Sequence, residues 1–424
     1  MRLLRDVIVD GSRVTVHADP EFSRRFLREP FFAEYSIGVD GVPDDIATIP
    51  FLTTMLPIAW RFGYDAQLET ADADFLGSMQ LARERLQAMY PEYEWTGRGE
   101  AVRGTREESP ATSRVGILFS GGVDSTFSAL RAAEAGADPV LITIWGNDVK
   151  LHDVLGWKDV SSHSARLAAA IGGESCTVKS NFRSFLRYDV LDASIPAQRS
   201  WWGFVQHGLA VTGLAAPVLH AREAGRLLVA ATHTATFDAP WGSGPELEGR
   251  LRWSSAVVEH DGFELSRQEK LQAILGWANS RSFPQHLRVC YSKSSDAGTN
   301  CGRCEKCLRT TTGLLLEGAA PEEWGFDVDA DEAALRVRRG FERGRLPIGD
   351  DELFMWHDLQ HRAEAGTAAG LDEQFRAWLL DFDFDTYRER EESRALGVKG
   401  AIRRGGRRGR AALRSVGGRL RARP

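Results

Sequence analysis

Residues 115–136 read VGILFSGGVDSTFSALRAAEAG, and this stretch decides how the central part of the chain folds. The apolar run Val115–Leu118 predicts a buried strand, and the residues after the turn read as a helix. Gly121 and Gly122 let the backbone of the turn approach a ligand closely. Because backbone amides and the start of a helix both attract an anion, the stretch predicts an anion-binding turn between a strand and a helix.

Apolar strands alternate with helices after this turn. Three further strands are predicted at residues 139–145, 174–180 and 226–234, with helices between them, the longest over residues 199–225. The β-α-β-α order predicts an α/β fold with a parallel, doubly wound sheet and helices on both faces. Ligands of such sheets bind beyond the carboxyl ends of the strands, which is where residues 119–125 lie.

The chain of 424 residues is longer than one hydrophobic core usually organises, and we expect four parts. They are an N-terminal α+β domain and linker (1–111), the α/β domain (112–312), a helical extension (313–390) and a basic, disordered tail (391–424). In the first part, alternation around Asp10 and Gly11 predicts a β-hairpin. Asp74 is the expected N-cap of a helix there.

Composition favours a cytoplasmic protein. The sequence is 43% hydrophobic and 26% charged, and no stretch reaches the roughly 20 apolar residues of a membrane span. The N-terminal residues have no long apolar core of the kind found in a secretory signal. The net charge is −6, yet residues 394–424 hold 11 Lys or Arg residues and no acid. Such a tail suits nucleic acid or an anionic surface, or it is simply a solvated end.

Four of the five cysteines fall within 18 residues, in the pattern C-x10-C-x2-C-x2-C. They are Cys290, Cys301, Cys304 and Cys307. Four thiolates can close a tetrahedron around one ion and leave no position for water, so the pattern predicts a structural Zn²⁺ site. An iron–sulfur cluster is the alternative, because four cysteines also hold one. Cys176 lies alone in a predicted strand and is expected in the core.

The side chains of the turn predict a particular anion. Ser120 and Ser125 add hydroxyl donors to the amides of Gly121 and Gly122. Asp124 would repel a phosphate, so its useful role there is to hold Mg²⁺, which neutralises a polyphosphate. The alternative is a tight strand-to-helix turn in which glycines serve geometry and serines serve capping.

The run SGGVDS (120–125) resembles the signature of the PP-loop ATP pyrophosphatase superfamily, which has a HUP-like fold. The cysteine loop, followed by Leu308 and Arg309, resembles the zinc loop of 7-cyano-7-deazaguanine synthase-like enzymes. The resemblance covers residues 112–312. It implies an ATP-dependent ligase, with Mg²⁺ and Zn²⁺, that cleaves ATP to AMP and pyrophosphate. The enzyme would adenylate a carboxylate or amide oxygen of a small molecule for attack by ammonia or an amine.

The resemblance also implies roles for individual residues. The ATP contacts would be Ser120, Gly121, Gly122, Val123, Asp124, Ser125, Ile144 and Trp145. The catalytic residues would be Asp124, Arg267 and Arg199, where Arg267 stands in the place of a family lysine. The substrate would meet Thr232, His233 and Asp238. For Arg199 the alternative is a solvated loop arginine, and for His233 it is a structural histidine.

The deazaguanine synthases that the chain resembles are roughly half its length, so the N-terminal domain and the C-terminal helical region are additions. They imply a larger substrate, or a protein partner bound through the N-terminal domain, and a homodimer is left open. Two other functions remain open. One is a sulfurtransferase that modifies tRNA, for which Cys176 would be the catalytic cysteine. The other is a non-catalytic nucleotide-binding scaffold.

Overall fold

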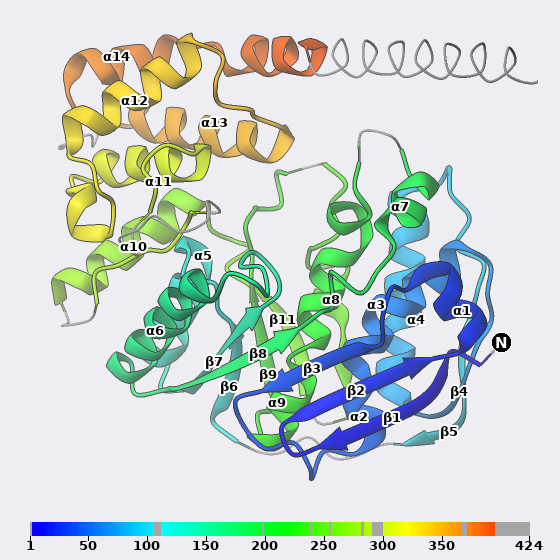
Figure 1. The fold of residues 1–424 in the computed structure, drawn as a ribbon. Helices are drawn as coiled ribbons and strands as arrows, with labels where there is room; N and C mark the ends of the chain where they lie inside the picture. The colour runs from blue at the N-terminus through cyan, green and yellow to red at the C-terminus, as the bar shows by residue number, and fades with distance from the viewer. Residues whose placement is uncertain are drawn as a thin grey trace, which may run out of the picture.

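The residues that the structure describes form a mixed sheet of nine strands, and helices cover both of its faces (Figure 1). The computed structural model describes residues 2–105, 112–196, 199–237, 239–254, 256–280, 284–290, 300–366 and 371–394. In spatial order the strands are β1 (Leu4–Asp10), β2 (Arg13–Ala18), β3 (Phe31–Tyr35), β8 (Glu174–Ser180), β7 (Asp138–Trp145), β6 (Arg114–Leu118), β9 (Arg226–Ala230), β11 (Ala256–Asp261) and β10 (Arg252–Trp253). The predicted α/β class is confirmed.

The five central strands β8, β7, β6, β9 and β11 run parallel to one another. In chain order they read 3-2-1-4-5 across the sheet, so the order reverses between β6 and β9. Open sheets bind ligands at the carboxyl ends of the strands beside such a reversal. The flanking strands β1, β2, β3 and β10 pair antiparallel, so the sheet is mixed and not wholly parallel as expected.

Neighbouring residues of the central strands point to opposite faces of the sheet, and each face is buried under helices. Leu141 and Leu228 pack in one apolar cluster with α5 and α6. Ile142 and Leu227 pack in another, beneath α3, α8 and α9. The helices are α1 (Pro20–Phe26), α2 (Asp44–Ala47), α3 (Ile49–Arg61), α4 (Ala73–Met89), α5 (Val123–Glu134), α6 (Val154–Ala170), α7 (Tyr188–Leu191), α8 (His207–Gly213), α9 (Ala216–Ala221), α10 (Arg267–Ser280), α11 (Glu305–Leu316), α12 (Ala330–Glu342), α13 (Asp350–Glu364) and α14 (Glu373–Asp381).

The N-terminal segment joins the central sheet. Its predicted hairpin is present, with Asp10 opposite Arg13 and Gly11 at φ +60°. The third strand, β3, then pairs with β8, and the ring of Phe31 lies 5.4 Å from that of Phe185. The sheet and its core thus cross the boundary expected at residue 111. Only β4 (Ala66–Asp72) and β5 (Gly99–Thr105) form a separate two-stranded parallel sheet within the described residues.

The N-cap of α4 is Asp72 and not Asp74, because the helix begins at Ala73 and Asp74 lies inside its first turn. Asp72 Oδ1 accepts a hydrogen bond of 2.8 Å from the backbone N–H of Phe75. Its Oδ2 accepts another of 2.9 Å from the backbone N–H of Ser254. One carboxylate therefore both caps α4 and ties it to the end of β10.

The long helix expected over residues 199–225 is broken into pieces. A π-helical turn, Trp202–Gln206, leads into α8, and α9 follows with Pro217 near its start. Pro lacks the N–H that would continue the ladder of the preceding helix. Sequence analysis also missed β11, which closes the parallel part of the sheet next to β9.

The helical extension is present as α12, α13 and α14, which gather with α11 at one end of the molecule (Figure 1). Trp356 and Phe341 are buried at the centre of this bundle, with their rings 4.8 Å apart. Most of the predicted basic tail, residues 395–424, lies outside the described residues. Within the described part of the chain, no helix has both the length and the apolar character needed to cross a bilayer.

Candidate functional site

The turn between β6 and α5 has a backbone conformation that requires glycine. Gly121 has φ +82°, and a Cβ there would lie 2.7 Å from Cδ2 of the buried His163 on α6. The carbonyl oxygen of Gly121 accepts a hydrogen bond of 2.8 Å from the backbone N–H of Arg288. The Oγ atoms of Ser120 and Ser125 lie 3.2 Å apart. The turn is thus held by two neighbouring segments, and both of its serine hydroxyls gather at one point.

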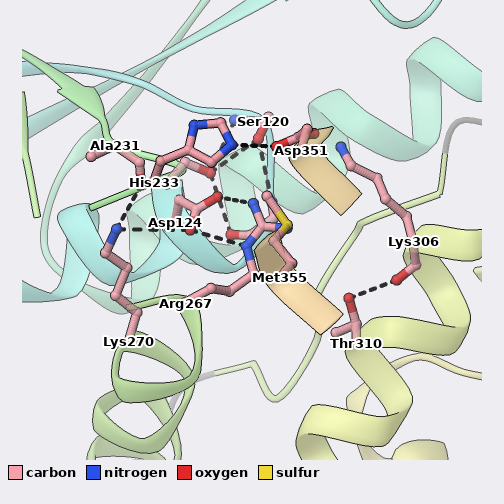
Figure 2. A network of polar contacts seen from close by, with 12 residues as sticks. Ser120, Asp124, Ala231, His233, Arg267, Lys270, Lys306, Thr310, Asp351 and Met355 are labelled. Atoms are coloured by element: carbon pink, nitrogen blue, oxygen red, sulfur yellow. Dashed lines mark hydrogen bonds and ion pairs between the residues drawn. The ribbon is translucent and has the colours of Figure 1, made fainter. Parts of the chain in front are cut away.

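Three charged side chains meet behind the turn (Figure 2): Asp124 from α5, and Arg267 and Lys270 from the first turn of α10. Arg267 Nε donates to Asp124 Oδ1 at 3.3 Å, and Arg267 Nη2 donates to Oδ2 over a shorter distance. Lys270 is fully buried; its Nζ lies 4.0 Å from Asp124 Oδ1 and donates to the carbonyl oxygen of Ala231 at 2.6 Å. One charge network therefore joins α5, α10 and the end of β9.

The network keeps Asp124 ionised. Burial by itself raises the pKa of this carboxyl, but Arg267 and then Lys270 lower it, and the result lies below the usual value of 3.8. Burial lowers the pKa of Lys270, and the nearby Asp124 carboxylate opposes that effect.

A cavity of about 260 Å³ lies beyond the carboxyl ends of β6, β7 and β9, next to the turn. One part of its wall is basic and comprises Arg267, Arg288 and Lys306. Another part is apolar or aromatic, with Ile144, Val149, Val160, Val211 and Trp241. The acids Asp124, Asp148 and Asp351 also line the cavity. An elongated ligand with an anionic end and a flat, less polar end would match both parts of this wall.

Helix α13 of the C-terminal extension closes one side of the cavity. Asp351 accepts a hydrogen bond from Nε2 of His233, which follows β9. Met355, one turn further along α13, accepts a bond of 3.1 Å from Nη1 of Arg267 at its sulfur. Figure 2 shows Asp351 beside the His233 ring and Met355 beside Arg267. The extension is therefore part of the site.

The four clustered cysteines come together as predicted, with all four Sγ atoms within 4.8 Å of one another. The Sγ of Cys304 lies 3.9 Å from that of Cys290 and 3.4 Å from that of Cys307, and the sulfurs of Cys301 and Cys307 are 3.8 Å apart. Four thiolates bound tetrahedrally to Zn²⁺ at 2.3 Å would place their sulfurs about 3.8 Å apart. The cluster could therefore hold a metal ion such as zinc. In an iron–sulfur cluster the sulfurs bind different irons, so a larger separation is expected.

Most residues expected at the nucleotide and substrate sites line this one cavity. They are Ser120, Gly122, Val123, Asp124, Ser125, Ile144, Thr232, His233 and Arg267. Gly121 lies in the same turn but supplies backbone only.

Two expected residues lie away from the cavity wall, and a third is not described. Trp145 stacks on Trp157 with ring centroids 5.2 Å apart, and its Nε1 donates to the carbonyl oxygen of Lys150, so it does not line the cavity. Arg199 is exposed and is not among the described residues that line the cavity. Asp238 lies outside the described residues.

Sequence analysis missed Lys270, Arg288, Lys306 and Asp351. A signal existed for Lys270, because it lies three residues after Arg267 and thus on the same face of a helix. Arg288 and Lys306 lie within two residues of a clustered cysteine, and both side chains line the cavity. For Asp351 there was no local signal, because its partner His233 is 118 residues away in sequence.

Neither family models, nor curated proteins, nor solved structures gave a match to this chain. Fold and site together define an α/β protein with a cavity, partly walled by basic residues, at the reversal point of its sheet. Beside the cavity lies a four-cysteine cluster that could hold a metal ion.

Proposed function

We propose that the cavity binds ATP, with its phosphates at the β6–α5 turn, and that the protein is an AMP-forming ligase of the PP-loop type. The observation that carries the proposal is the position of three basic side chains, Arg267, Arg288 and Lys306, around one cavity at that turn. Three cations around one cavity can contact several oxygens of a polyanion. The amides and hydroxyls of the turn add uncharged donors.

The other part of the wall supports a nucleotide in place of free pyrophosphate. The side chains of Ile144 and Val160 and the ring of Trp241 give an apolar surface on which a base can lie. The carboxylate of Asp148 and the amide of Asn147 lie on the same cavity and offer acceptors for ribose hydroxyls. The expected contact at Trp145 has no part in this arrangement.

Asp124 fits a magnesium role only if Arg267 changes partner. In the structure both carboxylate oxygens are engaged by the guanidinium. With nucleotide bound, Arg267 would turn to a phosphate oxygen and leave Asp124 to hold Mg²⁺. The buried ion pair between Asp124 and Arg267 would then be replaced by two contacts, Asp124 with Mg²⁺ and Arg267 with phosphate.

In the proposed reaction a carboxylate or amide oxygen of a small molecule attacks the α-phosphorus of ATP. The new O–P bond forms as the bond to the β-phosphate breaks, and pyrophosphate leaves with the electron pair. Ammonia or an amine then attacks the activated carbon, and AMP leaves. Arg288 and Lys306 would stabilise the charge on the departing pyrophosphate. The cysteine cluster, with four thiolates and no open position, suits a structural Zn²⁺.

The sulfurtransferase alternative is weakened by the position of Cys176. This thiol is fully buried in β8 and is absent from the cavity wall. Burial, together with Glu174, raises its pKa to about 12, so it is a poor nucleophile at neutral pH.

Calorimetry with Mg·ATP and with AMP tests the proposal. We expect ATP to bind more tightly than AMP in the wild-type protein. Arg288→Gln and Lys306→Gln should each weaken ATP binding about tenfold, the scale of one charge-assisted hydrogen bond, and affect AMP less. The matched control is Arg226→Gln, since Arg226 lies at the amino end of β9, away from the cavity, and pairs with Glu259 of β11. Equal affinities for ATP and AMP in all four proteins would refute the phosphate assignment.

Turnover is the second arm of the test. Wild-type protein is incubated with ATP, ammonia and a panel of carboxylates, and mass spectrometry follows AMP, pyrophosphate and any new adduct. Formation of all three supports the ligase. ATP binding without AMP formation on any carboxylate would instead favour a nucleotide-binding scaffold.

A further inference from the structure

His233 is held by groups from two different parts of the chain. Its ring stacks on Phe237, with centroids 3.8 Å apart and planes 8° apart. Phe354 of α13 meets the ring edge-on at 5.7 Å, and Asp351 of the same helix accepts a hydrogen bond from Nε2. The His233 side chain is only 12% exposed and lines the cavity. These three contacts fix the orientation of the ring at the cavity wall.

Asp351 fixes the orientation of the ring. Its carboxylate faces Nε2, so in the neutral ring the tautomer with its hydrogen on Nε2 is favoured and Nδ1 is the nitrogen able to accept a proton. Burial raises the pKa of Asp351, but the hydrogen bond and charge of His233, followed by Arg309 and Arg267, lower it to about 2. The carboxylate is therefore ionised whenever it faces His233 at neutral pH.

Helix α13 is anchored so that Asp351 has a fixed position. Asp358 Oδ2 accepts a bond of 3.1 Å from the backbone N–H of Gln268 at the start of α10. Trp356 Nε1 donates to Glu305 of α11 at 2.8 Å. These contacts attach α13 to the two helices that supply Arg267 and Lys306 to the same cavity.

We propose that His233, oriented by Asp351, is the general base that accepts the proton of the nitrogen nucleophile in the second half of the reaction. This inference rests on the proposed ligase function. The nitrogen forms a bond to the activated carbon, the bond from that carbon to the AMP oxygen breaks, and AMP leaves with the electron pair. The proton lost by the nitrogen goes to Nδ1 of His233. Asp351 is a positioning residue, and its place on α13 gives the C-terminal extension a role in chemistry.

The first test needs no substrate. Diethyl pyrocarbonate acylates unprotonated imidazole nitrogen, and mass spectrometry measures its rate of addition to the His233 peptide. We expect His233 to react in the folded wild-type protein and about tenfold more slowly in Asp351→Asn. The control is Asp350→Asn, which removes the neighbouring carboxylate, paired with Arg388 at 2.6 Å, and should leave the rate unchanged. An unreactive His233, or equal rates in wild type and Asp351→Asn, would overturn the inference.

The second test separates the two half-reactions with the carboxylate identified by the turnover screen. Exchange of labelled pyrophosphate into ATP reports adenylation alone, and we expect His233→Gln and Asp351→Asn to lower its rate far less than they lower product formation. Product formation with ammonia should fall about 100-fold, as expected for loss of a general base. Hydroxylamine, which is unprotonated at neutral pH, should restore most of the product. Parallel loss of exchange and product in both variants would overturn the base, whereas absence of exchange in the wild type would refute the proposed function itself.

Discussion

The buried contact between Asp124 and Lys270 predicts strong coupling between two substitutions. Two unit charges 4.0 Å apart attract by about 4 kcal/mol at the effective dielectric of a protein site. Asp124→Asn leaves Arg267 and the fully buried Lys270 as two cations without their shared anion. We expect this variant to lose about 3–5 kcal/mol of the free energy of unfolding, the usual cost of breaking a buried pair.

Lys270→Met alone should cost about 2–4 kcal/mol, because it strands the Asp124 carboxylate beside one cation and leaves the Ala231 carbonyl oxygen without its 2.6 Å donor. When Asp124→Asn is already present, the same change also removes a repulsion between cations. The double variant should therefore be more stable than the sum of the single effects by about 2 kcal/mol or more.

Urea unfolding followed by tryptophan fluorescence measures the four free energies of unfolding. As a control, Arg226→Gln and Glu259→Gln remove an exposed pair, for which the coupling should stay below about 1 kcal/mol. The pKa of Asp124 is lowered in the folded protein, so its contribution is present above the usual value of 3.8 and is lost as pH falls through the lowered value. Additive effects at pH 7, within about 0.5 kcal/mol, would refute the network.

Two other predictions concern the turn and the cysteine cluster. Gly121→Ala adds a Cβ at φ +82° and 2.7 Å from His163, so it should cost more than the roughly 1–2 kcal/mol of left-handed strain and should also weaken ATP binding. The control is Gly136→Ala, at φ +78° with open space around it, which should cost the strain alone. Equal losses of stability in the two variants would contradict the packing argument. Elemental analysis should find about one zinc per chain and none in Cys304→Ser. Iron with sulfide in place of zinc would contradict the inference drawn from the distances between the cysteine Sγ atoms.

The sequence was sufficient for features that depend on neighbours along the chain. The strand, turn and helix around Gly121 follow from local periodicity and from the need for φ > 0, and the cysteine grouping follows from spacing alone. The edge of the sheet could not be predicted in this way. The pairing of β3 with β8 depends on apolar contacts such as Phe31 with Phe185, which are distant in sequence and only compatible in space.

The residues of the site also fall into two groups, those predictable from neighbours along the chain and those that depend on contacts distant in sequence. Asp124 and Ser125 could be placed at the turn because the motif is contiguous. Trp145, expected at the ATP site from its position at the end of β7, does not line the cavity. An indole at a strand end serves equally well for stacking on a neighbouring helix, and Trp157 of α6 takes it. Asp351 reaches His233 only because α13 packs on α10 and α11, and no pattern within either segment encodes that contact.

The cysteine cluster also has a physical connection to the cavity. Asn300 Oδ1 accepts hydrogen bonds from the backbone N–H groups of Val289 and Cys290, at 2.9 and 3.1 Å, and so holds the segment that carries Arg288. Lys306 lies directly before Cys307 on α11. A metal ion held by the four thiolates would tie both segments together, and with them two of the three basic side chains of the cavity wall. Since charge-assisted contacts to phosphate depend on donor position, a structural metal there would act on nucleotide affinity without touching the nucleotide.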